Sequence, residues 1–161
     1  MSMLTFIRNC DKNVKEAVEM FAEDYMNDLK DITDILKEYN TYKQQHDYLD
    51  YDDLLFFTNE LFEKNENIAK TVANQYRYIM IDEYQDVNNL QLSLIKNMVK
   101  NVHNNVVVVG DDQQSIYAFR GANFKNIINF QKDFPGAKMI ILDKNYRSTQ
   151  GILNVANAVV N

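Results

Sequence analysis

Two carboxylates that directly follow an apolar segment are the residues best suited to chemistry. Residues 79–81 read Ile-Met-Ile, and Asp82 and Glu83 begin the string Asp-Glu-Tyr-Gln-Asp that comes next. Mg²⁺ prefers carboxylate oxygens, usually one or two from the protein, completed by phosphate and water oxygens. A neighbouring carboxylate can orient or deprotonate a water that attacks a phosphoryl group. The pair predicts a metal ligand and a water-activating base, with an acidic cap for the next helix as the structural alternative.

A second polar segment follows four consecutive valines at residues 106–109. Gly110 comes directly after them and permits the tight backbone turn that the end of a strand often needs. Gln114 carries an amide donor and a carbonyl acceptor on one side chain, so it can report whether a γ-phosphate is present. The polar residues at the ends of two apolar segments therefore predict a nucleotide site at the carboxyl edge of a sheet.

Aromatic side chains and an arginine continue this second segment. Tyr117, Phe119 and Arg120 lie within four positions of one another. Aromatic rings interleaved with a guanidinium suit base stacking and backbone contact on single-stranded nucleic acid. The alternative is that the apolar side chains simply pack in the core, and for Ile116 we favour that reading.

A third polar segment ends with Asn-Tyr-Arg-Ser-Thr at residues 145–149. Arg147 could neutralise charge that develops on a transferred phosphoryl group, as arginine fingers do. Tyr146 could stack on a nucleobase. Ser148 or Thr149 is more simply the N-cap of the last helix.

The apolar patterns predict how these segments are positioned. Apolar residues three and four apart indicate a helical face over residues 12–40. Short, fully apolar strands that alternate with helices indicate a parallel sheet covered on both faces. The fold class is therefore α/β, a partial parallel sheet with flanking helices, preceded by a helical segment. Strands are expected at residues 76–81, 105–109 and 139–142, and further helices from 51 or 52 to 64 and at 65–74, 88–102, 123–134 and 149–160.

Composition narrows the setting in which the chain works. The 161 residues carry 17 basic and 23 acidic side chains, a net charge of −6, which argues against a broad phosphate-binding surface. The single cysteine, Cys10, fits a reducing compartment. The sequence contains no run of about eighteen apolar residues, so no membrane span is expected and the cytoplasm is the expected location.

Together the three segments resemble motifs of the UvrD/Rep/PcrA family of superfamily 1 DNA helicases. The string that begins at Asp82 is similar to the family's Walker B-type motif II, residues 110–122 to motif III, and residues 142–149 to motif IV. Residues 49–55, Leu-Asp-Tyr-Asp-Asp-Leu-Leu, are similar to a family sequence upstream of motif II. Two departures are Gln113, where the family usually has aspartate, and Phe119, where tryptophan is common.

The resemblance implies a RecA-like fold and ATP-driven 3′–5′ movement on single-stranded DNA or 3′-tailed duplex DNA. It implies ATP and Mg²⁺ as cofactors and assigns a role to each matching residue. The implied roles are magnesium coordination for Asp82, catalytic base for Glu83, γ-phosphate sensor for Gln114, adenine contact for Tyr146, arginine finger for Arg147, and DNA contact for Tyr117, Phe119 and Arg120.

The sequence lacks one part of such a motor. Its first glycine is Gly110 and no glycine precedes a lysine, so there is no phosphate-binding loop of the form G-x-x-x-x-G-K. Relative to the family, residues 1–50 resemble the end of the 1B insertion, 51–145 a partial 1A motor domain, and 146–161 the start of 2A. We therefore expect a helicase fragment, inactive by itself, whose partner is the remainder of the motor.

Two other functions stay open at this point. One is a non-catalytic module that binds single-stranded DNA or a helicase partner. The other is a metal-dependent phosphatase or nuclease built on Asp82, Glu83, Asp111 and Asp112, although this hypothesis leaves Tyr146 and Arg147 without a role.

Overall fold

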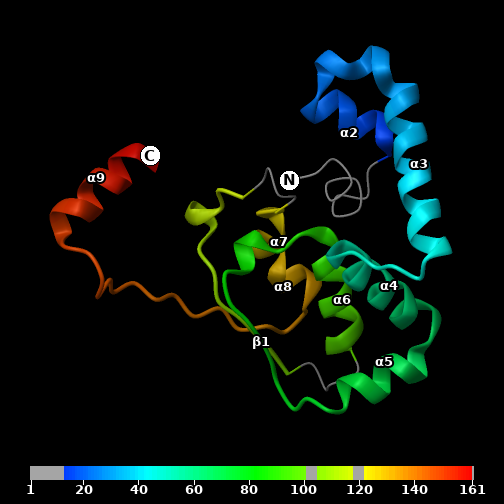
Figure 1. Cartoon of the computed structure of the whole chain (residues 1–161). Coiled ribbons are helices and arrows are strands. Elements are labelled where there is room, and N and C mark those ends of the chain that lie inside the picture. The colour runs from blue at the N-terminus through cyan, green and yellow to red at the C-terminus, as the bar shows by residue number, and fades with distance from the viewer. Residues whose placement is uncertain (1–12, 101–104, 118–121, 161) are drawn as a thin grey trace. The chain divides into compact units, whose positions relative to one another are not determined.

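The computed structural model describes residues 13–100, 105–117 and 122–160 (Figure 1). The chain divides into two compact units, the first ending at Ile127 and the second beginning at Ile128. The first unit is an α/β fold in which helices accompany a small parallel sheet, which confirms the predicted class. Its elements are α2 (Val14–Phe21), η1 (Glu23–Asp28), α3 (Leu29–Gln45), α4 (Tyr51–Lys64), α5 (Glu66–Ala73), β1 (Ile79–Ile81), η2 (Tyr84–Asp86), α6 (Asn89–Val99), β2 (Val106–Val108) and η3 (Asp112–Gln114).

The helical segment that precedes the sheet is broken where the sequence predicts one continuous face. Helix α2 ends at Phe21, because Ala22 leaves the helical region with φ −153° and ψ 45°. The 3₁₀ turn η1 follows, and α3 begins only at Leu29. The intervening residues Asp24, Asn27 and Asp28 are weak helix formers, which accounts for a break that apolar spacing alone does not reveal.

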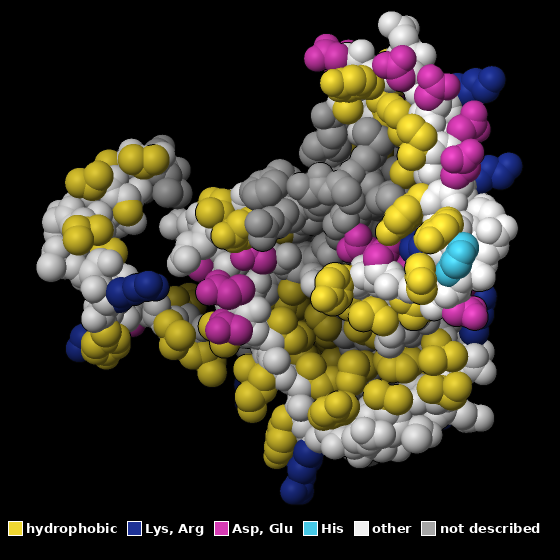
Figure 2. All heavy atoms as spheres, viewed as in Figure 1, with side chains coloured by type: hydrophobic (Ala, Val, Ile, Leu, Met, Phe, Trp, Pro, Cys, Tyr) yellow, Lys and Arg dark blue, Asp and Glu magenta, His cyan; other side chains and the backbone are white. Residues whose placement is uncertain are grey.

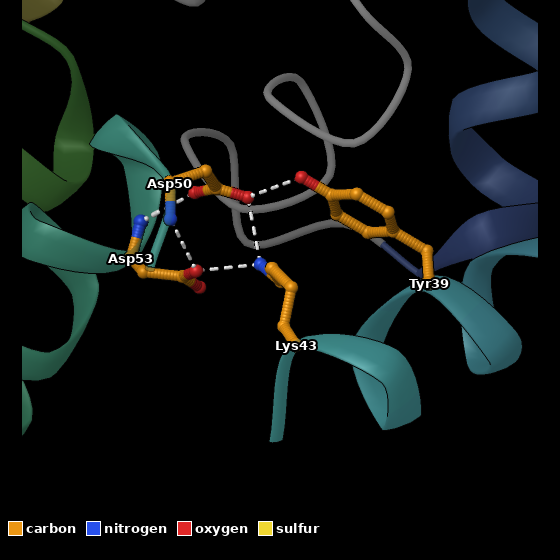
Figure 3. A network of polar contacts seen from close by, with 4 residues as sticks. All are labelled: Tyr39, Lys43, Asp50 and Asp53. Atoms are coloured by element: carbon orange, nitrogen blue, oxygen red, sulfur yellow. Dashed lines mark hydrogen bonds and ion pairs between the residues drawn. The ribbon is translucent and has the colours of Figure 1, made fainter. Parts of the chain in front are cut away.

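A buried ion cluster joins the end of α3 to the start of α4 (Figure 3). The ammonium of Lys43 donates to Asp50 Oδ2 at 2.6 Å and to Asp53 Oδ2 at 2.5 Å. Lys43 and Asp53 are buried, and Tyr39 Oη donates to Asp50 Oδ2 at 3.0 Å. Asp50 and Asp53 also form a reciprocal capping box, in which each side chain accepts the other residue's backbone N–H. The cluster therefore fixes both the start of α4 and its attachment to α3.

The electrostatics of this cluster follow from the same contacts. Partial burial by itself favours the protonated form of Asp50. Hydrogen bonds from Lys43, from the Asp53 backbone and from Tyr39 outweigh that effect and hold the pKa of Asp50 well below its usual range. The hydrogen bond to the Asp50 carboxylate in turn raises the pKa of Tyr39. Asp50 is thus held ionised as the acceptor of three donors.

The sheet consists of β1 and β2, which run parallel with Ile79 opposite Val106 and Ile81 opposite Val108. Both strands lie within the predicted segments and are shorter than predicted. Helix α6 lies between them in the sequence and starts with a capping box, in which Asn88 Oδ1 accepts the Gln91 N–H and Gln91 Oε1 accepts the Asn88 N–H. The parallel pairing brings the carboxyl ends of β1 and β2 to one edge of the sheet.

Helices α4, α5 and α6 contact one another and enclose most of the buried apolar side chains of this region. Phe62 of α4, Ala69 and Ala73 of α5, and Leu92 and Val99 of α6 are buried. Full burial of a side chain such as Phe62 stabilises a fold by about 1.5–3 kcal/mol. These helices therefore form the main apolar core of the first unit.

Two predictions for residues 123–142 differ from the structure. The helix expected over residues 123–134 is interrupted at Asn129, giving α7 (Lys125–Ile128), which crosses the unit boundary, and α8 (Phe130–Asp133). The prediction of a strand at residues 139–142 is wrong, since these residues form no strand and are 69 to 82% exposed. An apolar segment becomes a strand only when a partner supplies its hydrogen bonds. The final helix, α9 (Gln150–Val160), is confirmed.

Hydrophobic side chains gather on an exposed face of α4 and α5 (Figure 2). Phe56, Phe57 and Leu61 of α4 and Ile68 of α5 are each about 40% exposed. None of the helices in residues 13–100, 105–117 and 122–160 has the length and apolarity needed to cross a membrane.

Candidate nucleotide-hydrolysis site

The two carboxylates predicted to carry the chemistry lie immediately after β1. Asp82 Oδ1 accepts the Glu83 backbone N–H at 2.9 Å, which closes a tight turn at the strand end. Both side chains are exposed, and the 3₁₀ turn Tyr84–Asp86 follows. The capping alternative does not describe them, because α6 begins further on and is capped by Asn88 and Gln91.

The backbone at Glu83 adopts a conformation that L-residues avoid. Its φ and ψ are +49° and +44°, in the left-handed region. A residue other than glycine held there costs of order 1–3 kcal/mol and persists only when its surroundings determine it. Tyr84 supplies part of that constraint, because its N–H donates to the Val109 carbonyl at 2.9 Å beyond the end of β2 and its side chain is buried. The strained turn presents the Glu83 carboxylate beyond the sheet edge.

A hollow of about 390 Å³ adjoins these carboxylates. Asp86 contributes to its wall, and Asp86 Oδ1 is a buried acceptor without a hydrogen-bond partner among the residues that the structure describes. A buried, unsatisfied carboxylate oxygen beside two exposed carboxylates fits a cation or a hydrogen-bond donor as occupant. The hollow is lined by Ile81, Asp82, Glu83, Asp86, Val87, Gln91, Leu94 and Ile95.

The same residues define how a magnesium ion could be held. Within the described ranges, no three His, Cys, Asp or Glu side chains converge as a metal cage. Mg²⁺ commonly takes only one or two carboxylates and completes its shell with phosphate and water oxygens, so Asp82 at the strand end suits it. A phosphatase or nuclease centre on Asp82, Glu83, Asp111 and Asp112 is disfavoured, because these described side chains do not converge as one metal-binding group.

The loop after β2 is held by the Asp111 carboxylate. Its Oδ1 accepts the Gln113 backbone N–H at 3.0 Å, and its Oδ2 accepts the side-chain amide of Gln114 at 2.9 Å. The Gln114 N–H donates to the Asp111 carbonyl at 3.1 Å. Gln114, the predicted phosphate sensor, is exposed, and its side-chain amide is oriented by the hydrogen bond to Asp111.

Gln85 joins the two loops, and it was not among the predicted site residues. Its Nε2 donates to Glu83 Oε2 at 2.7 Å, and its Oε1 accepts the Asp111 N–H at 3.0 Å. The side chain is 2% exposed, although Glu83, Asp111 and Gln114 are all exposed. The structure thus brings Glu83 and Gln114 into one hydrogen-bonded chain through Gln85 and Asp111. The only signal in the sequence was the position of Gln85, two residues after Glu83.

A second connection links Val87, directly after η2, to residues 123–126. Asn126 is buried, and its Nδ2 donates to the Val87 carbonyl at 2.9 Å. The Asn123 N–H donates to the same carbonyl at 3.2 Å. Sequence reasoning missed both asparagines, because their partners are more than thirty positions away.

The predicted nucleic-acid contacts are only partly within the described residues. Tyr117 is 37% exposed, whereas Phe119 and Arg120 lie outside the described residues. The packing favoured for Ile116 is wrong, since its side chain is 69% exposed in an irregular segment after η3.

Tyr146 and Arg147 belong to the second unit. Tyr146 is 85% exposed, with the Lys144 ammonium 5.1 Å from the centre of its ring. Asn145 Oδ1 accepts the backbone N–H groups of Arg147 and Ser148, both at 2.8 Å. The local turn leaves both predicted side chains directed to solvent.

Comparison with known proteins shows the family of the chain. The family model for the UvrD/REP helicase N-terminal domain matches residues 1–135. The chain belongs to the UvrD/REP helicase family, as its motifs predicted.

Named relatives agree with that assignment. The chain is 43% identical over 129 residues to the ATP-dependent DNA helicase PcrA of Staphylococcus epidermidis, an alignment covering 80% of this chain and 18% of the relative. It is 49% identical over 127 residues to DNA helicase II of Rickettsia typhi, covering 79% and 19%. It is 41% identical over 139 residues to PcrA of Staphylococcus aureus, covering 86% and 19%. The chain thus spans less than a fifth of the length of these relatives.

Proposed function

We propose that the chain is part of an ATP-dependent DNA helicase and supplies the metal-facing and water-facing carboxylates of its motor. The observation that carries this proposal is the hydrogen-bonded chain from Glu83 through Gln85 and Asp111 to Gln114. It joins the loops beyond two parallel strands, the place where α/β sheets bind ligands. The relatives named as ATP-dependent DNA helicases support the same class of reaction.

Each residue then has a defined task. Asp82 lines the hollow and would hold Mg²⁺, which would neutralise charge on the phosphates of ATP. Glu83 orients the attacking water and accepts its proton. Gln114 offers its amide to the γ-phosphate, and Arg147 places positive charge on the transferred group. Tyr146 packs against the adenine.

Contact with DNA falls to the segment after Gln114. Tyr117, Phe119 and Arg120 combine stacking rings with a guanidinium, which favours single-stranded DNA or a 3′-tailed duplex. We propose 3′–5′ movement along the strand, in the cytoplasm. These residues lie within six positions of Gln114 in the sequence, which favours phosphate contact and DNA contact by one segment of the chain.

The chain by itself should bind ATP weakly. Its sequence supplies no glycine before Gly110, and hence no phosphate-binding loop to hold the β- and γ-phosphates. The remaining segments of a helicase motor would provide that loop and are the proposed partner. We therefore place residues 1–50, 51–145 and 146–161 as parts of the 1B, 1A and 2A regions of such a motor.

Calorimetric titration with MgATP, in the presence and absence of a single-stranded oligonucleotide, tests this function. We expect no binding below the millimolar range in either case. Micromolar binding coupled to DNA would mean that another surface replaces the phosphate-binding loop. Tight, salt-dependent oligonucleotide binding that is independent of nucleotide, and lost in Tyr117→Ala, would favour the non-catalytic binding module instead.

A further inference from the structure

Gln85 is the one buried member of a chain of otherwise exposed polar side chains. It donates to the Glu83 carboxylate at 2.7 Å and accepts from the Asp111 backbone at 3.0 Å, and its own side chain is 2% exposed. A side-chain amide can donate one hydrogen bond and accept another at the same time, whereas an ionised carboxylate only accepts and a hydrocarbon does neither. Leaving either contact unmade inside the protein costs about 1–3 kcal/mol, so the two contacts are maintained together.

The surroundings leave Gln85 little freedom to turn. A Cβ added at Gly110 would lie 2.7 Å from Gln85 Oε1, so the backbone of the second loop passes directly against the amide. The residues directly before Gln85 and Gly110 are also joined, because the Tyr84 N–H donates to the Val109 carbonyl at 2.9 Å. A displacement of the loop that carries Asp111 must therefore carry the Gln85 amide with it.

From this geometry we propose that Gln85 is a positioning residue, which makes the orientation of the Glu83 carboxylate depend on the loop Asp111–Gln114. The Gln114 amide now donates to Asp111 Oδ2. When a phosphate oxygen takes that donor instead, Asp111 loses the contact at Oδ2 and keeps those to the Gln113 and Gln114 N–H groups. The carboxylate and its loop then reorient, and the hydrogen bond from the Asp111 N–H to Gln85 transmits this change to the Glu83 carboxylate. This regulation rests on the proposed function, because it assigns Gln114 to phosphate and Glu83 to water.

Nuclear magnetic resonance on the 161-residue chain tests the connection without nucleotide. The readouts are the side-chain carboxyl carbon of Glu83 and the side-chain amide of Gln85. Gln114→Ala should shift both signals. Gln113→Ala is the matched control, because Gln113 contacts Asp111 through its backbone N–H, which alanine keeps; it should move neither signal. In a Gln85→Met background, which preserves length and removes the amide, Gln114→Ala should no longer move the Glu83 signal.

Two results would overturn the proposal. One is a Glu83 signal that responds equally to Gln113→Ala and Gln114→Ala. The other is a response to Gln114→Ala that persists unchanged in the Gln85→Met background. If Gln85→Met does not fold, the comparison of Gln113→Ala with Gln114→Ala in the otherwise native chain still tests whether the Glu83 signal depends on the Gln114 amide. No ATP is added in this experiment, so a negative result would contradict the role of Gln85 without contradicting the helicase function. Conversely, failure to bind nucleotide would contradict the proposed function without contradicting the link between Gln114 and Glu83 through Gln85.

Discussion

Replacing Gly110 with alanine should weaken the fold at the junction of the two loops. The added Cβ would lie 2.7 Å from Gln85 Oε1, 2.8 Å from Ile127 Cδ1 and 3.2 Å from the Tyr84 nitrogen. Ordinary van der Waals contact begins at 3.4 Å, so the nearest neighbour must retreat by 3.4 − 2.7 = 0.7 Å. Gln85 cannot retreat without disturbing its hydrogen bonds to Glu83 and Asp111.

The size of the effect follows from three contributions. Overpacking of this kind costs about 1–3 kcal/mol. Loss of the bond from the Asp111 N–H to Gln85 adds about 0.5–1.5 kcal/mol. Alanine lowers the entropy of the unfolded chain relative to glycine, which by itself raises the free energy of unfolding by about 0.4–1 kcal/mol. We expect the free energy of unfolding to fall by roughly 0.5–4 kcal/mol as a net result.

Urea unfolding followed by circular dichroism measures this loss. Gly151→Ala is the matched control, because Gly151 lies in α9 and an added Cβ meets nothing within 4 Å. Alanine within a helix is favoured by about 0.5–1 kcal/mol, so this control should not lower stability. A Gly110→Ala variant as stable as the native chain would refute the close approach of Gly110 to Gln85.

Three further predictions concern other parts of the molecule. Lys43→Met should destabilise the fold by about 3–5 kcal/mol, because it leaves the Asp53 carboxylate buried without its ammonium partner. The control is Lys37→Met, at an exposed position on the same helix, which should cost under about 0.5 kcal/mol. Urea unfolding measures both free energies. The folded pKa of Asp50 is lowered, so its stabilisation is complete above the unfolded value and is lost as the pH falls through the folded one. The difference in unfolding free energy between the native chain and Asp50→Asn should therefore be constant from about pH 8 to 6 and shrink below about pH 4, and a difference that grows on acidification would contradict this. Gly136→Ala should cost about 1–2 kcal/mol through backbone strain alone, since φ is +89° and no neighbour lies within 4 Å, and thermal unfolding of the second unit should register it.

The parts of the fold that depend on local sequence were predictable. Residues 79–81 and 106–109 are short, apolar and followed by polar residues, so residue types alone locate the two strands and the carboxylates at the end of β1. Helix α4 has its acidic start at Asp50 and Asp53, and the two form the capping box that such a start favours.

The remaining features depend on contacts between distant residues. Nothing local to Gln85 indicates that it is buried, because its burial follows from the approach of Gly110 in another loop. Lys43 looks like any surface lysine until α4 brings Asp53 to it. Residues 139–142 have the composition of a strand, yet strand formation requires a partner that composition cannot supply.

The most direct test of the central claim is to locate a bound metal ion by paramagnetic broadening. Mn²⁺, a substitute for Mg²⁺, would be titrated into the chain together with ATP while the backbone amide signals are recorded, which detects even millimolar binding. The account predicts that residues 82–86 broaden first, that Asp82→Asn abolishes this effect, and that Asp52→Asn, in the acidic start of α4, leaves it intact. Broadening centred on residues 50–53, or unchanged by Asp82→Asn, would contradict the claim that Asp82 holds the metal of a helicase motor.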